Sequence, residues 1–114
     1  LAASLARHSR HPFSRALAFD PKTMQVTWTY TDPTPISFFS PFMGSAERLW
    51  NGNTLICESA FGRLFEVTPE GATVWEFVIP DFAEYPSPLN RFIVGATNSC
   101  FRAHRYTKEQ IPWL

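Results

Sequence analysis

Arg15-Ala-Leu-Ala-Phe-Asp-Pro-Lys-Thr-Met-Gln-Val-Thr-Trp-Thr-Tyr30 is the stretch on which the fold prediction depends, because its design recurs later in the chain. The second copy reads Arg63-Leu-Phe-Glu-Val-Thr-Pro-Glu-Gly-Ala-Thr-Val-Trp-Glu-Phe77. The prolines of the two copies are 48 residues apart, but Trp28 and Trp75 are 47 residues apart, so the second turn is one residue shorter. Self-similarity with this period indicates a repeated supersecondary unit.

Each copy predicts a hairpin, since two runs rich in β-branched and aromatic residues flank a turn that contains proline. A further hairpin is expected between the copies, where the Asn51-Gly52-Asn53 link is typical of a type I′ turn. A last run, Ser99–Tyr106, predicts a single strand. The hairpin strands are expected at 15–19 with 25–30, 45–50 with 54–58, and 63–68 with 73–78.

Alternation along the repeated strand puts Trp28 and Tyr30 on one face, together with Val26. A large indole on that face would pack against a neighbouring sheet, and one small sheet cannot bury both of its faces alone. The sequence therefore predicts an all-β fold, a partial β-propeller of about two four-stranded antiparallel blades. The expected divisions are 14–31 as the outer strand pair of one blade, 44–79 as one complete blade, and 98–107 as a strand of the next or closing blade.

Composition limits the classes of function. The 114 residues carry ten basic and ten acidic side chains, so a neutral chain gives no reason to expect a nucleic-acid partner. No apolar run approaches the roughly 18 residues that span a bilayer, and Leu1–Arg10 does not read as a secretory signal. The one helix-compatible segment is Leu1–Ala6, which is too short to carry a fold.

The two cysteines, Cys57 and Cys100, are too few for a disulfide scaffold or a closed zinc site. They could pair in an oxidising compartment. Two separate buried thiols are the preferred interpretation.

Longer strings carry a family resemblance. Ala18–Trp28 resembles the tryptophan-docking PQQ-like repeat of quinoprotein-type propellers, with Met24 where the pattern has glycine, whereas the second copy keeps Gly71. More of the chain is similar to the C-terminal blades of the arylsulfotransferase-like propeller family. The strings that carry this second resemblance are 44–56, 62–71, 74–77 and 101–106.

The resemblance implies a six-bladed propeller several times longer than this chain, whose remaining blades or other protein subunits are its partners. Characterised members transfer a sulfuryl group from an aryl sulfate to a phenol through a histidine intermediate. The isolated chain is then expected to be inactive and to need no cofactor. A periplasmic or extracytoplasmic location is compatible with the family. The alternative is a non-enzymatic scaffold or interaction subunit, which could close a ring as a homo-oligomer.

His104 is the sharpest candidate for chemistry, because alternation along the last run puts it on one face with Arg102 and Tyr106. A guanidinium beside an imidazole could bind a sulfate and supply a nucleophile or an acid. Phe101, Ala103 and Arg105 would share the other face. The preferred interpretation is nevertheless a strand at the rim, with Arg102 and His104 solvated.

The remaining candidates are structural. Asp20 and Glu66 are expected to accept turn N–H groups rather than to form a catalytic pair of carboxylates. His8 and His11 are expected to belong to a solvated terminus, and the apolar loop 36–43 to be buried under a neighbouring blade. The residues assigned to the structural repeat are Trp28, Trp75, Asp20, Gly71, Asn51 and Gly52.

Overall fold

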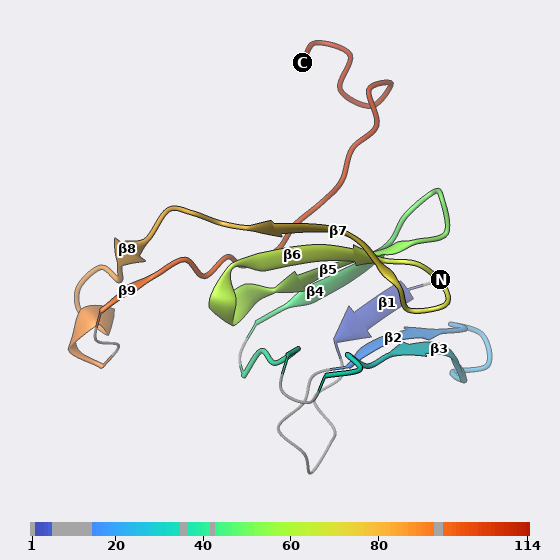
Figure 1. Cartoon of the computed structure of the whole chain (residues 1–114), viewed down its shortest axis with the longest axis horizontal. Helices are drawn as coiled ribbons and strands as arrows, with labels where there is room; N and C mark the ends of the chain where they lie inside the picture. The colour runs from blue at the N-terminus through green and yellow to red at the C-terminus, as the bar shows by residue number, and fades with distance from the viewer. Residues whose placement is uncertain (1, 6–14, 35–36, 42, 93–94) are drawn as a thin grey trace.

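The computed structural model of the chain describes residues 2–5, 15–34, 37–41, 43–92 and 95–114. This part of the chain is all-β, with antiparallel strands, two short 3₁₀ helices and no α-helix (Figure 1). His8 and His11, and residues 36 and 42 of the loop 36–43, lie outside the described residues, so the predictions for them stay predictions. The strands are β1 (Ala2–Leu5), β2 (Ala16–Phe19), β3 (Val26–Tyr30), β4 (Ser45–Arg48), β5 (Thr54–Glu58), β6 (Arg63–Val67), β7 (Thr73–Val78), β8 (Ala83–Glu84) and β9 (Ala96–Thr97); the 3₁₀ helices are η1 (Ser59–Phe61) and η2 (Leu89–Arg91).

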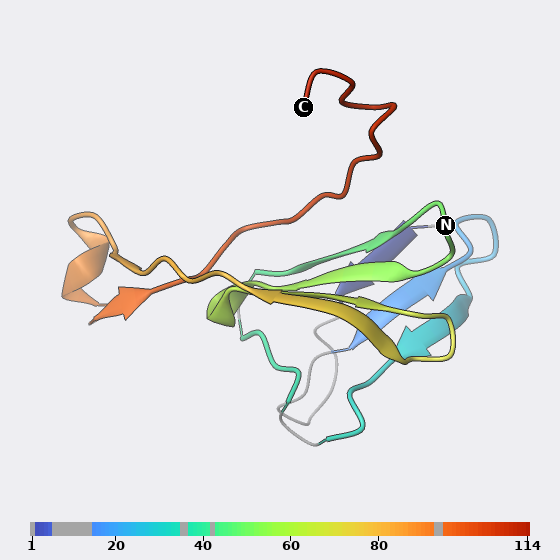
Figure 2. The same ribbon diagram turned by 45° about the horizontal axis from the view of Figure 1, so that its top comes forward.

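The strands form three antiparallel sheets. The first sheet has the order β1-β2-β3, the second sheet has the order β4-β5-β6-β7, and β8 pairs with β9. Figure 2 shows the first sheet against one face of the second, while the C-terminal end of the chain extends away from both. Trp28 and Trp75 therefore lie in different sheets, which face each other.

The sequence repeat is also a repeat of backbone register. Ala18 pairs with Trp28 in the first sheet, as Glu66 pairs with Trp75 in the second. The register shifts directly after each of these pairs, at Phe19 and at Val67. A bulge changes the local twist of a strand, so the same bulge at the same position gives the two hairpins the same shape.

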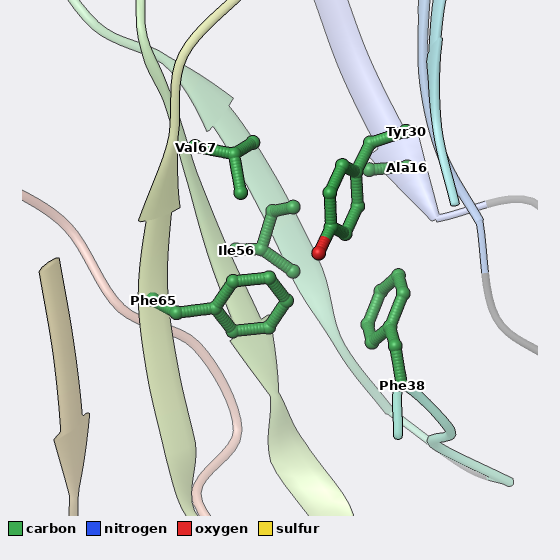
Figure 3. Packing of buried hydrophobic residues seen from close by; sticks show 6 residues of the cluster. All are labelled: Ala16, Tyr30, Phe38, Ile56, Phe65 and Val67. Atoms are coloured by element: carbon green, nitrogen blue, oxygen red, sulfur yellow. The ribbon is translucent and has the colours of Figure 1, made fainter. Parts of the chain in front are cut away.

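The core lies between the two sheets. Ile56, Phe65 and Val67 point from the second sheet toward Ala16 and Tyr30 of the first, as Figure 3 shows. The rings of Tyr30 and Phe65 lie 5.9 Å apart, a normal separation for an aromatic pair. Burial, and then the charge of Asp32, raise the pKa of Tyr30 to about 12.

Phe38 completes this core from the connection between β3 and β4. Its ring packs edge-on against Phe65 at 5.4 Å, and its side chain is fully buried. The expectation of burial in this loop is therefore confirmed for Phe38, which lies between the sheets of this chain.

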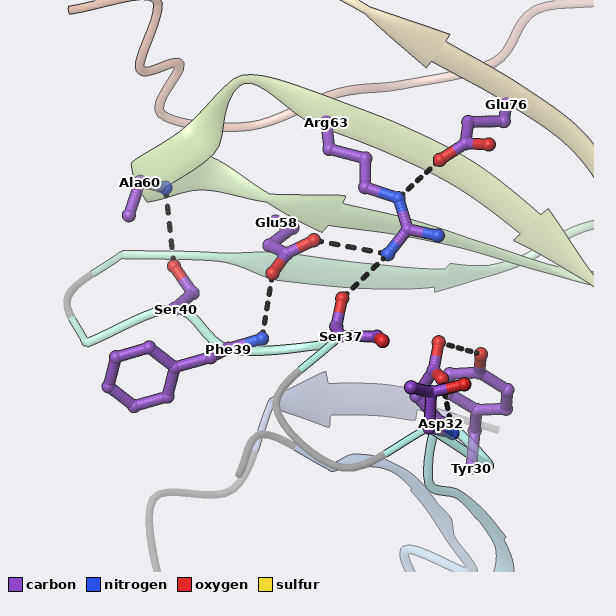
Figure 4. Close-up of polar contacts among 10 residues, drawn as sticks. Tyr30, Asp32, Ser37, Phe39, Ser40, Glu58, Ala60, Arg63 and Glu76 are labelled. Atoms are coloured by element: carbon purple, nitrogen blue, oxygen red, sulfur yellow. Dashed lines mark hydrogen bonds and ion pairs between the residues drawn. The ribbon is translucent and has the colours of Figure 1, made fainter. Parts of the chain in front are cut away.

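A cluster of charges fastens the same connection to the second sheet (Figure 4). Arg63 donates to Ser37 O at 3.0 Å and pairs with Glu58 and Glu76. The carboxylate of Glu58 also accepts the backbone N–H of Phe39 at 2.7 Å. Buried charges need such partners, and here the partners hold the loop in place.

Several expectations are wrong. The segment considered helix-compatible contains β1, because Ala2–Leu5 pairs with β2 and gains its hydrogen bonds there. No strand covers Ser99–Tyr106, because no described strand pairs with it.

The type I′ turn is wrong too. Gly52 N–H bonds to Leu49 O and Leu49 N–H bonds to Asn53 O, so residues 50–52 form the loop. Gly52 has φ +87° and is the one loop residue in the left-handed region. This geometry is a three-residue hairpin loop, which needs a positive φ at its last residue alone.

The turns after β2 and β6 repeat the same pattern. Thr68 N–H donates to Ala72 O, as Leu49 N–H donates to Asn53 O. Gly71 has φ +89°, close to that of Gly52. The first copy has one more residue, and there Met24 takes the left-handed position with φ 58°. The carboxylate of Asp20 accepts Lys22 N–H at 2.8 Å, which is the turn hydrogen bond expected of it.

Candidate functional site

The second sheet has an outer face, which points away from the first sheet. The backbone register aligns Glu47, Leu55, Glu66 and Trp75 across the four strands, and Ser45, Cys57, Leu64 and Phe77 in the adjacent row. Residues of the intervening rows form the core, so these two rows face the other way. We call this set of eight residues the outer face.

The C-terminal segment, residues 98–107, lies on this face. Cys100 N–H donates to Ser59 O at 3.0 Å, and the Asn98 amide donates to Ile79 O at 3.0 Å. Gly62 permits this approach, because a Cβ at that position would lie 2.3 Å from Asn98 O. The segment is therefore packed against the sheet along its first part.

Although it is not a paired strand, the C-terminal segment keeps the alternation of one. Exposure alternates residue by residue from 102 to 107, with Ala103, Arg105 and Thr107 partly buried. Arg102, His104 and Tyr106 are the exposed set. The two faces expected from the sequence are thus present, except that Phe101 is exposed.

Glu66 is the buried carboxylate of the outer face. Its Oε1 accepts the side-chain amides of Asn53 at 2.7 Å and Asn51 at 3.2 Å, and its Oε2 pairs with Arg105. Glu66 was expected to accept turn N–H groups, but the groups that donate to it are the side chains of Asn51, Asn53 and Arg105. They come from the β4–β5 turn and the C-terminal segment, so this carboxylate joins three parts of the chain.

The candidates for chemistry are only partly brought together. His104 Nδ1 lies 3.1 Å from Glu47 Oε2, and the rings of His104 and Tyr106 are 6.4 Å apart. Among the described residues, Arg102 makes no hydrogen bond or ion pair and its side chain is exposed. A carboxylate orients the imidazole, but Arg102, the guanidinium expected beside it, is exposed and has no contact with it.

Trp75 and Phe77 form the apolar part of the outer face. Their rings stack at 6.3 Å with planes 18° apart, and the side chains are 38% and 44% exposed. Trp28 and Tyr30, at the same positions of the first sheet, stack at 6.4 Å with planes 17° apart. The two pairs have the same geometry but different surroundings.

An arginine covers each tryptophan. The Arg48 guanidinium lies 4.7 Å from the Trp28 ring, and that of Arg105 lies 4.9 Å from the Trp75 ring. Arg48 belongs to β4, the first strand of the sheet on which Trp28 packs. Arg105 belongs to the C-terminal segment and so holds the corresponding position above the second sheet.

Sequence reasoning missed Arg105, although a signal was present. Ala46-Glu-Arg48 and Ala103-His-Arg105 share an alanine two residues before an arginine. Ala46 packs against the core, as Trp28 does, and Ala103 is partly buried. The match is too short to recognise without knowing that both arginines cover a tryptophan.

The structure offers no metal centre in its described part, where no three His, Cys, Asp or Glu side chains gather. The same part contains no helix with the length and apolarity to cross a membrane. Comparisons with family models, curated proteins and solved structures found no match for the chain.

Proposed function

We propose that this chain is a segment of a β-propeller and that its function is to stack and pair with further β-strands, which belong to other blades or subunits. The repeated arginine–tryptophan contact carries the proposal. Arg48, on the first strand of the sheet that follows Trp28 in the chain, packs its guanidinium on the Trp28 ring. Arg105 packs in the same way on Trp75 and lies in the segment that follows the second sheet. The C-terminal segment would therefore be the first strand of a third sheet.

An unpaired strand supports this assignment. Among the described residues, 102–106 take part in no β-ladder, yet they keep the alternation of a strand. The backbone N–H and C=O groups of residues 102–106 could pair with another strand, in the way that those of β4 pair with β5. The partner is an antiparallel sheet whose inner side covers Trp75 and Phe77.

Sulfuryl transfer is the second candidate, proposed from the family resemblance for the complete ring alone. The contact between His104 and Glu47 favours it, because a carboxylate on Nδ1 orients the imidazole and leaves Nε2 as the nucleophilic atom. We expect no transfer from p-nitrophenyl sulfate to phenol by the isolated chain. Turnover that is lost in His104→Ala would contradict the need for further blades.

Self-association tests the stacking proposal, since a second copy of the chain supplies sheets of the same kind. A non-enzymatic scaffold that closes a ring by homo-oligomerisation makes the same prediction. Native mass spectrometry and sedimentation should show concentration-dependent oligomers, with a blue shift of tryptophan emission as Trp75 is covered.

Two variants make the test specific to the outer face. Phe77→Glu should keep the chain monomeric, because it introduces a charge beside Trp75. Phe82→Glu is the matched control: Phe82 is 62% exposed and lies beyond the end of β7. A wild-type chain that stays monomeric at every concentration, or a loss of association in both variants, would contradict the proposal.

A further inference from the structure

The two cysteines of the chain meet at the outer face. Cys57 lies on β5 with its side chain 1% exposed, and Cys100 lies in the C-terminal segment. Their sulfur atoms are 3.2 Å apart, and both are free thiols. Both thiols are unpaired, as the preferred interpretation from the sequence had it, but their sulfur atoms are in contact and Cys100 is only partly buried.

The backbone on both sides keeps the thiols together. Cys100 N–H donates to Ser59 O at 3.0 Å, and Ser59 Oγ donates to Phe101 O at 3.3 Å. The same hydroxyl lies 3.2 Å from Cys57 Sγ. Ser59 therefore contacts both Cys57 and the C-terminal segment. The packing of that segment against the sheet is what places the two thiols opposite each other.

We propose that Cys57 and Cys100 form a disulfide that fastens the C-terminal segment to the second sheet. Two electrons and two protons pass from the two thiols to a disulfide oxidant such as glutathione disulfide, which becomes two reduced glutathiones. One thiolate attacks that oxidant and releases one glutathione; the other thiolate then attacks the mixed disulfide and releases the second.

The burial of the two thiols determines which one reacts first. Cys100 is partly exposed, whereas Cys57 is buried, so the oxidant can reach Cys100. Burial, and then the hydrogen bond with Cys57, raise the pKa of the Cys100 thiol to about 12. Little Cys100 thiolate is present at neutral pH, so the bond should form slowly. The same raised pKa makes Cys100 a poor leaving group, so the bond should also be reduced slowly, as suits a tether.

Equilibration with glutathione measures the proposal directly. The full chain is equilibrated at different ratios of reduced to oxidised glutathione, with and without guanidinium. Each sample is quenched in acid, and its mass is measured by intact-protein mass spectrometry. The disulfide lowers the mass by about 2 Da. We expect an effective concentration at least ~100-fold higher in native buffer than in guanidinium, because folding has already closed the long loop between the cysteines.

The same factor must appear in stability, since disulfide formation and folding are linked in one thermodynamic cycle. The oxidised chain should therefore melt on the order of 10 °C above the reduced chain. Equal effective concentrations in the two solvents would overturn the proposal.

A variant with a displaced cysteine tests whether the disulfide depends on the folded position of Cys100 opposite Cys57 or only on the number of residues between the cysteines. In Cys100→Ser with Ala103→Cys, the two thiols are nearly as far apart in sequence, but the second one lies further along the segment. In native buffer, the effective concentration of the two thiols of this variant should equal the one that the wild-type chain shows in guanidinium. Disulfide formation as favourable as in the native pair would overturn the proposal, while Cys57→Ser should give a glutathione adduct alone.

Discussion

Trp28 with Tyr30 and Trp75 with Phe77 are the same structural unit in two different environments. Both pairs stack with nearly the same ring separation and angle, and an arginine covers each tryptophan. The first pair has a complete sheet in front of it: Tyr30 is 3% exposed, and Trp28 Nε1 donates to Pro69 O at 2.7 Å. The second pair has a single extended segment in front of it and is about two-fifths exposed.

The difference shows that local sequence builds the pair and that the neighbouring sheet decides its energetic value. Stacking and register are local and recur in both hairpins. Burial is not local, because it depends on what lies opposite. Apolar area contributes to stability in proportion to the area removed from water, so equal side chains contribute unequally here.

Truncation at the shared position should give the largest difference. Tyr30→Ala empties a buried site that Phe65 and Phe38 line, and should lower the free energy of unfolding by about 3–5 kcal/mol. Phe77→Ala, at the same repeat position, should cost about 1 kcal/mol because the ring is 44% exposed. Urea denaturation measures both. Equal losses in the two variants would mean that the outer face is already a core.

Two glycines sharpen the role of the C-terminal segment. Gly62→Ala puts a Cβ 2.3 Å from Asn98 O at a residue with φ +58°, so the segment must move. We expect a loss of about 2–4 kcal/mol, together with a change in tryptophan emission as Arg105 leaves Trp75.

Gly52→Ala is the control for backbone conformation alone. Gly52 has φ +87° and nothing within 4 Å of an added Cβ. It should cost about 1 kcal/mol and leave the emission unchanged. Equal stability losses and equal emission changes in the two variants would mean that the close approach of Asn98 to Gly62 does not contribute to the stability of the chain.

Much of the fold could be predicted from alternation and repetition. Regular alternation identified both tryptophan hairpins, and the one-residue difference between the copies is a longer loop in the first. The strand at Ala2–Leu5 could not be predicted, because alanines carry little β-propensity and the strand depends on pairing with β2. The Asn-Gly step allows more than one loop, and the pairing of Arg48 with Thr54 and of Leu49 with Asn53 leaves the three-residue form.

The candidate site was less predictable, because its contacts join distant parts of the chain. The pairing of Arg105 with Glu66 and the contact of Cys57 with Cys100 depend on where the C-terminal segment lies. Alternation correctly gave the two faces of that segment, but it could not tell which face meets the sheet. The contact of His104 with Glu47 has no local signal for the same reason.

The smallest expected effect concerns the two turns that carry the tryptophan hairpins. Met24 and Gly71 both take a positive φ, at 58° and 89°, but glycine alone takes it without steric cost. Met24→Gly should therefore raise stability by about 0.5–1 kcal/mol, with part of the gain lost to the greater freedom of glycine in the unfolded chain. The reciprocal Gly71→Met should lower stability by about 1 kcal/mol or slightly more, because the turn that it strains also accepts the Trp28 indole at Pro69. Thermal unfolding resolves shifts of this size, and changes of the same sign in both variants would show that the two turns are not equivalent after all.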